Sequence, residues 1–150
     1  MPLTPQERAR KSADALWADD HASKWMGLVV SKVDEGTAET TLNVEQHHCN
    51  GHGMCHGGVI FTLADSAFAF ACNSRNQVTV AQQNSITFVA AGQLGDTLTA
   101  RAREVVSTGR SGVYDVTVTN QTGKVIAEFR GLSRSIKGQL FEEPTPEGDS

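Results

Sequence analysis

Proline is nearly absent from the interior of this 150-residue chain. Its four prolines lie near the two ends, at Pro2, Pro5, Pro144 and Pro146. Because proline interrupts helices and central strands, we expect a single domain, residues 1–150, with an ordered core from about residue 4 to residue 141. The C-terminal stretch beyond that core is acidic and poor in apolar residues, so the sequence predicts that it is disordered.

Runs of basic residues and long apolar runs are also missing. The net charge is -4, which favours neither a nucleic-acid partner nor a membrane surface. The most apolar segment, residues 59–72, is shorter than the roughly 20 residues that a membrane-spanning helix requires. The chain has three cysteines, an odd number, and no recognisable signal peptide. We therefore expect free thiols in a cytoplasmic protein.

The order of the sequence patterns predicts an α+β fold. Thr4 can cap a first helix that reaches Trp17, with Pro5 at its first position and Glu7 three residues after the cap. Residues 19–21 are expected to form a loop. A second, central helix over 59–72 is apolar on nearly every face, so it should be buried. The expected strands are 27–33, 37–44, 78–91, 97–106, 113–119 and 124–136.

The last four of these strands are expected to be joined by hairpin-like turns, at residues 95–96, 109–112 and 120–123. The arrangement is then an antiparallel sheet with one central helix. A single sheet wrapped around one helix leaves its other face and its edges without partners, so we expect the protein to form oligomers.

The stretch from Cys49 to Ser74 carries the residues with chemical potential. Gly57 and Gly58 begin the central helix, and without side chains they let an acyl oxygen approach backbone N–H groups at the positive end of the helix dipole. Asp65 lies about two turns further along, and its carboxylate could activate water or attack directly. The simpler alternative is an acid satisfied by hydroxyls or backbone donors. Asn50 could orient the water or the carbonyl, and Ser66 lies beside Asp65.

A metal site is the main competing interpretation of this stretch, because six potential ligands occupy ten residues. They are His47, His48, Cys49, His52, Cys55 and His56. The two cysteines are separated by five residues rather than by two to four, and no second pair completes a ligand set. We therefore predict no metal site. Cys55 has no feature of a nucleophile, and the simplest role for His56 is to bond backbone groups and shape the turn.

A second candidate site is the turn STGRSG. Its backbone N–H groups, the hydroxyls of Ser107 and Ser111, the flexible Gly109 and the guanidinium of Arg110 could bind a phosphate group. Taken alone, a turn of this composition is more often only a turn.

The segment NGHGMCHGGVIFTLADSAFAFACNS resembles the signature of the hotdog-fold acyl-CoA thioesterases, in particular their phenylacetate-degradation subfamily. The likeness extends over about residues 13–136 and includes the stretches DTLTA, GVYDVTVTNQ and FRG. It implies a hotdog fold, a long central helix wrapped by an antiparallel sheet. It also implies hydrolysis of an aryl acyl-CoA, such as phenylacetyl- or hydroxyphenylacetyl-CoA, with coenzyme A as part of the substrate and no separate cofactor.

The resemblance also implies roles for individual residues. It places the family's catalytic acid on Asp65, its loop asparagine on Asn50 and its carbonyl-polarising amide on Gly57. In the family the acid and the loop residues come from opposite subunits of a dimer, and dimers pair into tetramers. The coenzyme A phosphates are then expected at the turn containing Ser107, Gly109, Arg110 and Ser111.

His56, Gly58 and Ser66 neighbour the expected catalytic residues and should contact the substrate. The loop departs from the family pattern at residues 53–54, which leaves the exact acyl group open. Two other activities stay open as well: a non-catalytic acyl-CoA-binding domain, and a hotdog hydratase or dehydratase with His56 as its base.

Overall fold

The computed structural model describes residues 2–144. In chain order the helices and strands are α1 (Pro5–Ala18), α2 (His21–Met26), β1 (Val29–Asp34), β2 (Thr37–Asn43), a short 3-10 helix (Gln46–His48), α3 (Gly57–Cys72), β3 (Thr79–Phe88), β4 (Thr97–Thr108), β5 (Ser111–Thr119) and β6 (Val125–Ser135). The strands form one antiparallel sheet in the order β1-β2-β4-β5-β6-β3. The α+β arrangement expected from the sequence is confirmed.

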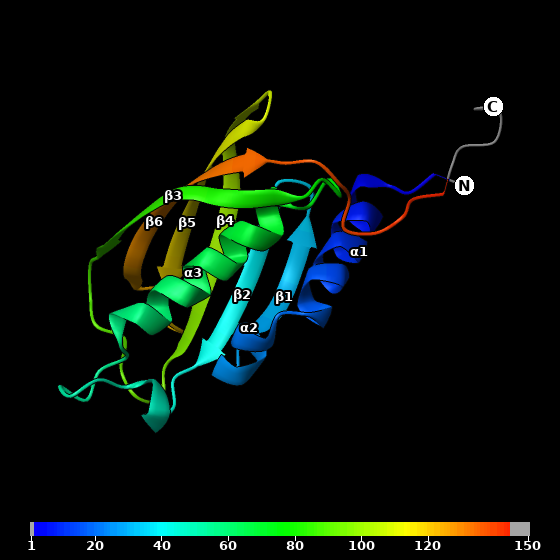
Figure 1. The fold of residues 1–150 in the computed structure, drawn as a ribbon. Helices are drawn as coiled ribbons and strands as arrows, with labels where there is room; N and C mark the ends of the chain where they lie inside the picture. The colour runs from blue at the N-terminus through cyan, green and yellow to red at the C-terminus, as the bar shows by residue number, and fades with distance from the viewer. Residues whose placement is uncertain (1, 145–150) are drawn as a thin grey trace.

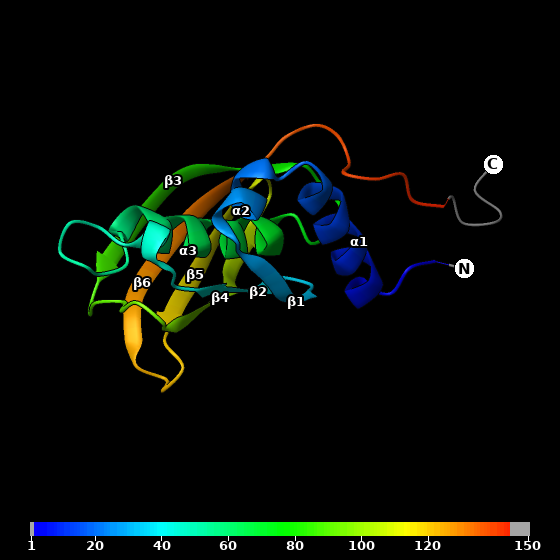
Figure 2. The ribbon, with the colours of Figure 1, turned by 90° about the horizontal axis from the view of Figure 1, so that it is seen from below.

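The long helix α3 lies across one face of the curved sheet, and α1 lies beside the β1 edge (Figures 1 and 2). Eight of the sixteen α3 residues are buried, as expected for a helix that is apolar on most faces. Phe68 packs at the centre of this layer, with its ring centroid 5.6 Å from that of Tyr114 on β5 and 5.9 Å from that of Phe129 on β6. The helix is therefore the centre of the hydrophobic core.

The N-terminal helix begins as the sequence predicts. The Thr4 side chain accepts from the Glu7 N–H, and Glu7 accepts in return from the Thr4 N–H, which is a complete capping box. The loop expected over residues 19–21 is only partly correct, because His21 is the first residue of α2. Asp20 caps this short helix by accepting from the Ser23 N–H at 3.0 Å.

The expected series of hairpins is wrong at its first member. β4, β5 and β6 are consecutive antiparallel neighbours, but β3 pairs with β6 at the far edge of the sheet and not with β4. The chain leaves β3, crosses the end of the sheet and enters β4. The following turn is also shorter than expected, since only Gly109 and Arg110 separate β4 from β5, with Gly109 at φ +61°.

The chain beyond β6 passes back toward α1. Asn76, buried before β3, accepts from the N–H groups of Leu140 and Phe141, and Arg8 of α1 pairs with Glu143 at 2.8 Å. The segment expected to be disordered begins at residue 142, so only the Glu143 contact falls within it, and 145–150 lie outside the described range. Within residues 2–144 no helix is long and apolar enough to cross a membrane.

Candidate active site

The loop before α3 is held by its own backbone and by Asn50. The Asn50 Oδ1 accepts from the N–H groups of His52 and Met54, at 2.9 and 3.2 Å. The Asn50 N–H donates to the Met54 carbonyl at 2.8 Å. His48 is buried beneath the loop, and its ring binds the Glu45 N–H and the Met26 carbonyl. The loop is therefore held by hydrogen bonds among the protein's own groups.

His56 caps α3, and this leaves one amide available. The His56 Nδ1 accepts from the Gly58 N–H at 2.8 Å. The N–H groups of Val59 and Ile60 donate to the His56 carbonyl. Among residues 2–144, no acceptor receives a hydrogen bond from the Gly57 N–H. Of the first four N–H groups of α3, the Gly57 amide is thus the one left for a ligand, at the positive end of the helix dipole.

An apolar hollow of about 360 Å³ lies beside this free amide. Met54 and Cys55 contribute from the loop, Gly57 and Ile60 from α3, and residues 88–92 from the end of β3 and the segment after it. A Cβ added to Gly57 would lie 3.0 Å from the tip of the Phe88 ring. The glycine therefore allows the close approach of the Phe88 ring, because a side chain here would push against that ring.

Asp65 lies in the middle of α3, half-buried, on the side that faces β3. The Asn84 side-chain amide donates to its Oδ1 at 2.9 Å. Burial raises the pKa of the Asp65 carboxyl, and the hydrogen bond from Asn84 partly opposes that rise. A carboxylate with a raised pKa in a helix lined by apolar residues is a typical candidate for a general base.

Asp65 and the Gly57 amide do not meet within one chain. They are eight residues apart on the same helix, which corresponds to about 12 Å along its axis. A base and an oxyanion donor must each lie about 3 Å from the reacting groups. Within one chain, the two groups are therefore too far apart to act on the same thioester.

The remaining predicted site residues lie in two separate places. Ser66 is directed toward α2, where its Oγ is 3.2 Å from the Ser23 Oγ. The exposed turn between β4 and β5 is at the other end of the sheet from the 49–56 loop, about 35 Å along β4. There Gly109 and Arg110 line an open hollow of about 460 Å³ together with Gln77 and Lys137. Two cations at one hollow suit an anionic group.

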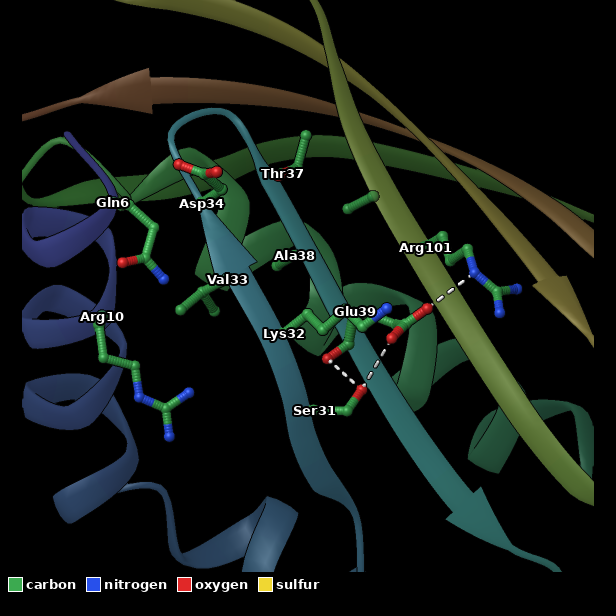
Figure 3. Close-up of a pocket in the computed structure, with 11 residues that line it drawn as sticks. Gln6, Arg10, Ser31, Lys32, Val33, Asp34, Thr37, Ala38, Glu39 and Arg101 are labelled. Carbon is green, nitrogen blue, oxygen red and sulfur yellow. Dashed lines mark hydrogen bonds and ion pairs between the residues drawn. The ribbon is translucent and has the colours of Figure 1, made fainter.

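Another hollow, of about 600 Å³, contains none of the predicted site residues. It lies between α1 and the outer side of β1, β2 and β4, with Gln6 and Arg10 on the helix side (Figure 3). Its main acid, Glu39, already pairs with Arg101 at 2.7 Å and accepts from Ser31. The carboxylate of Glu39 is therefore already paired, and none of the residues predicted to act in catalysis lies here.

The cluster of histidines and cysteines does not converge. No three His, Cys, Asp or Glu side chains in the described part of the chain are placed to share a metal ion. Burial raises the pKa of the Cys55 thiol to about 11 and that of Cys72 to about 12. Both thiols are therefore protonated at neutral pH and are poor nucleophiles.

Comparison with known proteins identifies the family. The thioesterase superfamily model matches residues 52–127. The acyl-coenzyme A thioesterase PaaI of Escherichia coli is 42% identical over 136 residues, which cover 91% of this chain and 97% of that protein.

Solved structures agree with this assignment. The structure of PaaI from the E. coli phenylacetic acid degradation operon matches with a TM-score of 0.89 and covers 91% of this chain and 99% of that one. A Streptococcus mutans protein bound to acetyl-CoA matches at 31% identity, with a TM-score of 0.72, over 75% of this chain and 90% of that one. This chain therefore has the hotdog fold and belongs to the thioesterase superfamily, as a relative of the PaaI acyl-CoA thioesterase.

Proposed function

We propose that this protein is an acyl-CoA thioesterase that hydrolyses an aryl-type acyl-CoA, phenylacetyl- or hydroxyphenylacetyl-like, to the free acid and coenzyme A. One observation carries the proposal: α3 presents both a free amide at its N-terminus, on Gly57, and a half-buried carboxylate with a raised pKa, on Asp65. The family and the relatives above support the same reaction.

The reaction follows from these two groups. The Gly57 N–H donates to the thioester carbonyl oxygen and stabilises the negative charge that develops there. Asp65 takes a proton from water as the water oxygen attacks the carbonyl carbon. Alternatively, Asp65 attacks that carbon itself, in which case the acyl group passes to the carboxylate as an anhydride that water then hydrolyses to the free acid. The C–S bond then breaks, and the sulfur leaves as a thiolate that is protonated to coenzyme A. The apolar hollow beside Gly57, with Phe88 and Ile60, would hold the acyl group.

We also propose a homodimer in which each site takes Asp65 from one chain and the Asn50–Gly57 loop from the other, with dimers pairing into tetramers. The axial separation of about 12 Å between Asp65 and Gly57 within one chain supports a site that is shared between two chains. The outer edge of β3 supports the interface, because it has no strand beside it within residues 2–144. Val80 and Phe88 of this strand and Val89 just after it are exposed by 44, 50 and 59%.

The coenzyme A portion would extend to the turn at Ser107–Ser111 of a chain other than the one that contributes Gly57, where Arg110 offers a cation for a phosphate. His56 fits a structural role better than that of a dehydratase base. Its Nδ1 is occupied by the Gly58 N–H, and the ring forms the cap of α3. We propose no metal or separate cofactor, because water is the only other reactant.

The direct test is thiol release from a panel of aryl and alkyl acyl-CoAs, run with and without excess EDTA. We expect steady release of coenzyme A, fastest with aryl-acetyl groups and unchanged by EDTA. Tight binding of the same compounds without any release would indicate a non-catalytic binding domain instead. Loss of activity in EDTA, restored by one metal ion, would overturn the mechanism.

The shared site gives a complementation test. Asp65→Asn and Asn50→Ala variants should each be weakly active alone. After mixing in equal amounts and subunit exchange, activity should recover to about a quarter of wild type, since half the dimers are mixed and each has one intact site. The exchange is checked by mass spectrometry. No recovery despite verified exchange would contradict a site shared between chains.

A further inference from the structure

The residue that faces Asp65 is placed by an irregularity in β3. The pairing of β3 with β6 shifts register between Ala81 and Gln83, which leaves Gln82 as an extra residue. Thr79 and Ala81 lie opposite Ser135 and Ser133 of β6, whereas after the shift Asn84 lies opposite Gly131. An extra residue of this kind reverses the alternation of side chains along the strand. It turns Asn84 toward α3, where strict alternation from Thr79 would have turned it outward.

The position opposite Asn84 has no side chain, and the helix fills the space. A Cβ built on Gly131 would lie 2.7 Å from the Phe68 ring. Phe68 therefore packs directly on the Gly131 backbone and draws α3 close to the sheet. This close packing brings Asp65, one turn before Phe68, within hydrogen-bond distance of Asn84 on the neighbouring strand.

Of the two polar atoms of the Asn84 side chain, only the nitrogen makes a hydrogen bond within the described residues. Its Nδ2 donates to the Asp65 Oδ1 at 2.9 Å. Its own Oδ1 is buried and accepts no hydrogen bond from any group among residues 2–144. A buried carbonyl oxygen without a donor is rare and costly, and it commonly marks a position that water or a ligand completes. The free oxygen belongs to the same side chain that holds the candidate base.

We propose that Asn84 is a positioning residue for the thioesterase reaction: it fixes Asp65 through Oδ1, leaves Oδ2 free, and offers its own Oδ1 to the attacking water. One water proton then points to Asp65 and the other to Asn84. On attack, the first proton passes to the Asp65 Oδ2, and the second stays on the oxygen that becomes part of the acid product. This inference rests on the proposed function.

The surroundings of Asp65 make Asn84 its main modulator. On α3 the titratable neighbour is Cys72, and from β5 the Tyr114 hydroxyl faces the same layer. Burial raises the pKa of both, so both are neutral at working pH. The polar group on the α2 side, Ser23, does not titrate, and β2 and β6 face α3 with apolar residues and with Thr40, Gly131 and Ser133. β4 adds Glu104, whose carboxylate accepts from the Tyr114 hydroxyl at 2.9 Å and pairs with Arg75 at 2.7 Å. Within residues 2–144, no cation offsets the loss of the Asn84 donor.

The test is the pH dependence of kcat/KM in Asn84→Ala and Asn84→Asp. The bond from Asn84 lowers the pKa of Asp65, so removing it should move the acidic limb to higher pH. The isosteric Asn84→Asp keeps the packing but adds a like charge beside Asp65. The acidic limb of its pH profile should therefore move further toward high pH. We expect kcat of Asn84→Ala to fall by about 10- to 100-fold, the range for a hydrogen bond to a charged group. Ser85→Ala, on the opposite face of β3, is the matched control and should behave as wild type.

A second measurement separates this inference from the proposed function. The Asp65 carboxyl is titrated directly by carbon NMR in the wild type and in the Asn84 variants, with Asp65→Asn used for assignment. An upward shift of the Asp65 pKa in the variants supports the coupling between Asn84 and Asp65, even if Asp65 proves dispensable for hydrolysis. Wild-type titration and a wild-type pH profile in Asn84→Asp would overturn the proposal, because only a structural role would survive that replacement.

Discussion

Replacement of Asp65 by asparagine should lower kcat by at least about 100-fold and leave the protein folded. The expected loss is the usual scale for a general base, because the amide has nearly the shape of the carboxylate but cannot take a proton. The assay is thiol release at saturating acyl-CoA. A matched control is Asp14→Asn, which removes an exposed carboxylate on α1 and should not change kcat. Retention of near wild-type kcat in Asp65→Asn would exclude the carboxylate from the chemical step.

The raised pKa of Asp65 adds two consequences that can be checked on the same variant. Activity of the wild type should fall as the pH drops through that raised pKa, since the base must be ionised. The residual activity of Asp65→Asn should not show this acidic limb in its pH profile. Ionisation of Asp65 also affects stability, and it lowers the free energy of unfolding, whereas ionisation of a salt-bridged acid raises it. A pKa that is higher in the folded than in the unfolded protein means that ionised Asp65 destabilises the fold above the unfolded pKa. Asp65→Asn should therefore be at least as stable as wild type at neutral pH in urea unfolding.

Replacement of Gly57 by proline should lower kcat by about 100- to 1,000-fold, the range for removal of one oxyanion donor. Proline removes the single N–H that α3 leaves free, and it does so with little expected damage to the helix. The first position of a helix tolerates proline because its N–H has no partner in the helix. His56, the preceding residue, is extended rather than helical, with φ -61° and ψ 136°, and this ψ is one that a following proline allows.

The matched control is Gly57→Ala. It introduces the same Cβ against Phe88 as proline does, at 3.0 Å, but it keeps the amide hydrogen. The difference in kcat between the alanine and proline variants therefore measures the amide alone, and circular dichroism checks that α3 is intact in both. Equal losses in the two variants would mean that crowding at Phe88, and not the hydrogen bond, accounts for the effect.

Local patterns were sufficient for much of the fold. The capping box at Thr4 and Glu7 defines the start of α1 because both hydrogen bonds join residues within one turn. The length and apolar character of 59–72 predict a buried helix, since such a segment has no face to leave in water. The sequence also placed Gly57 at the start of α3 and Asp65 inside it, which is where the structure has them.

Other features depend on contacts between distant segments and could not be read from the sequence. β3 has the composition of a strand, but its neighbour is decided by competition among all the strands for the faces and edges of the sheet. Asn84 was missed for a related reason. The extra residue in β3 reverses the facing of every later side chain, and only the pairing with β6 shows where it lies.

The sequence by itself determined which groups this protein can use: a glycine amide at a helix N-terminus, one acid inside an apolar helix, and the loop that precedes them. Only the tertiary structure decided how these groups are tuned and combined. Asp65 acquires its partner because Phe68 packs on the bare backbone of Gly131 and brings α3 against β3. The physical reason is that hydrogen-bond partners and burial are set by packing between segments, whereas helix starts and apolar faces are set by neighbours along the chain.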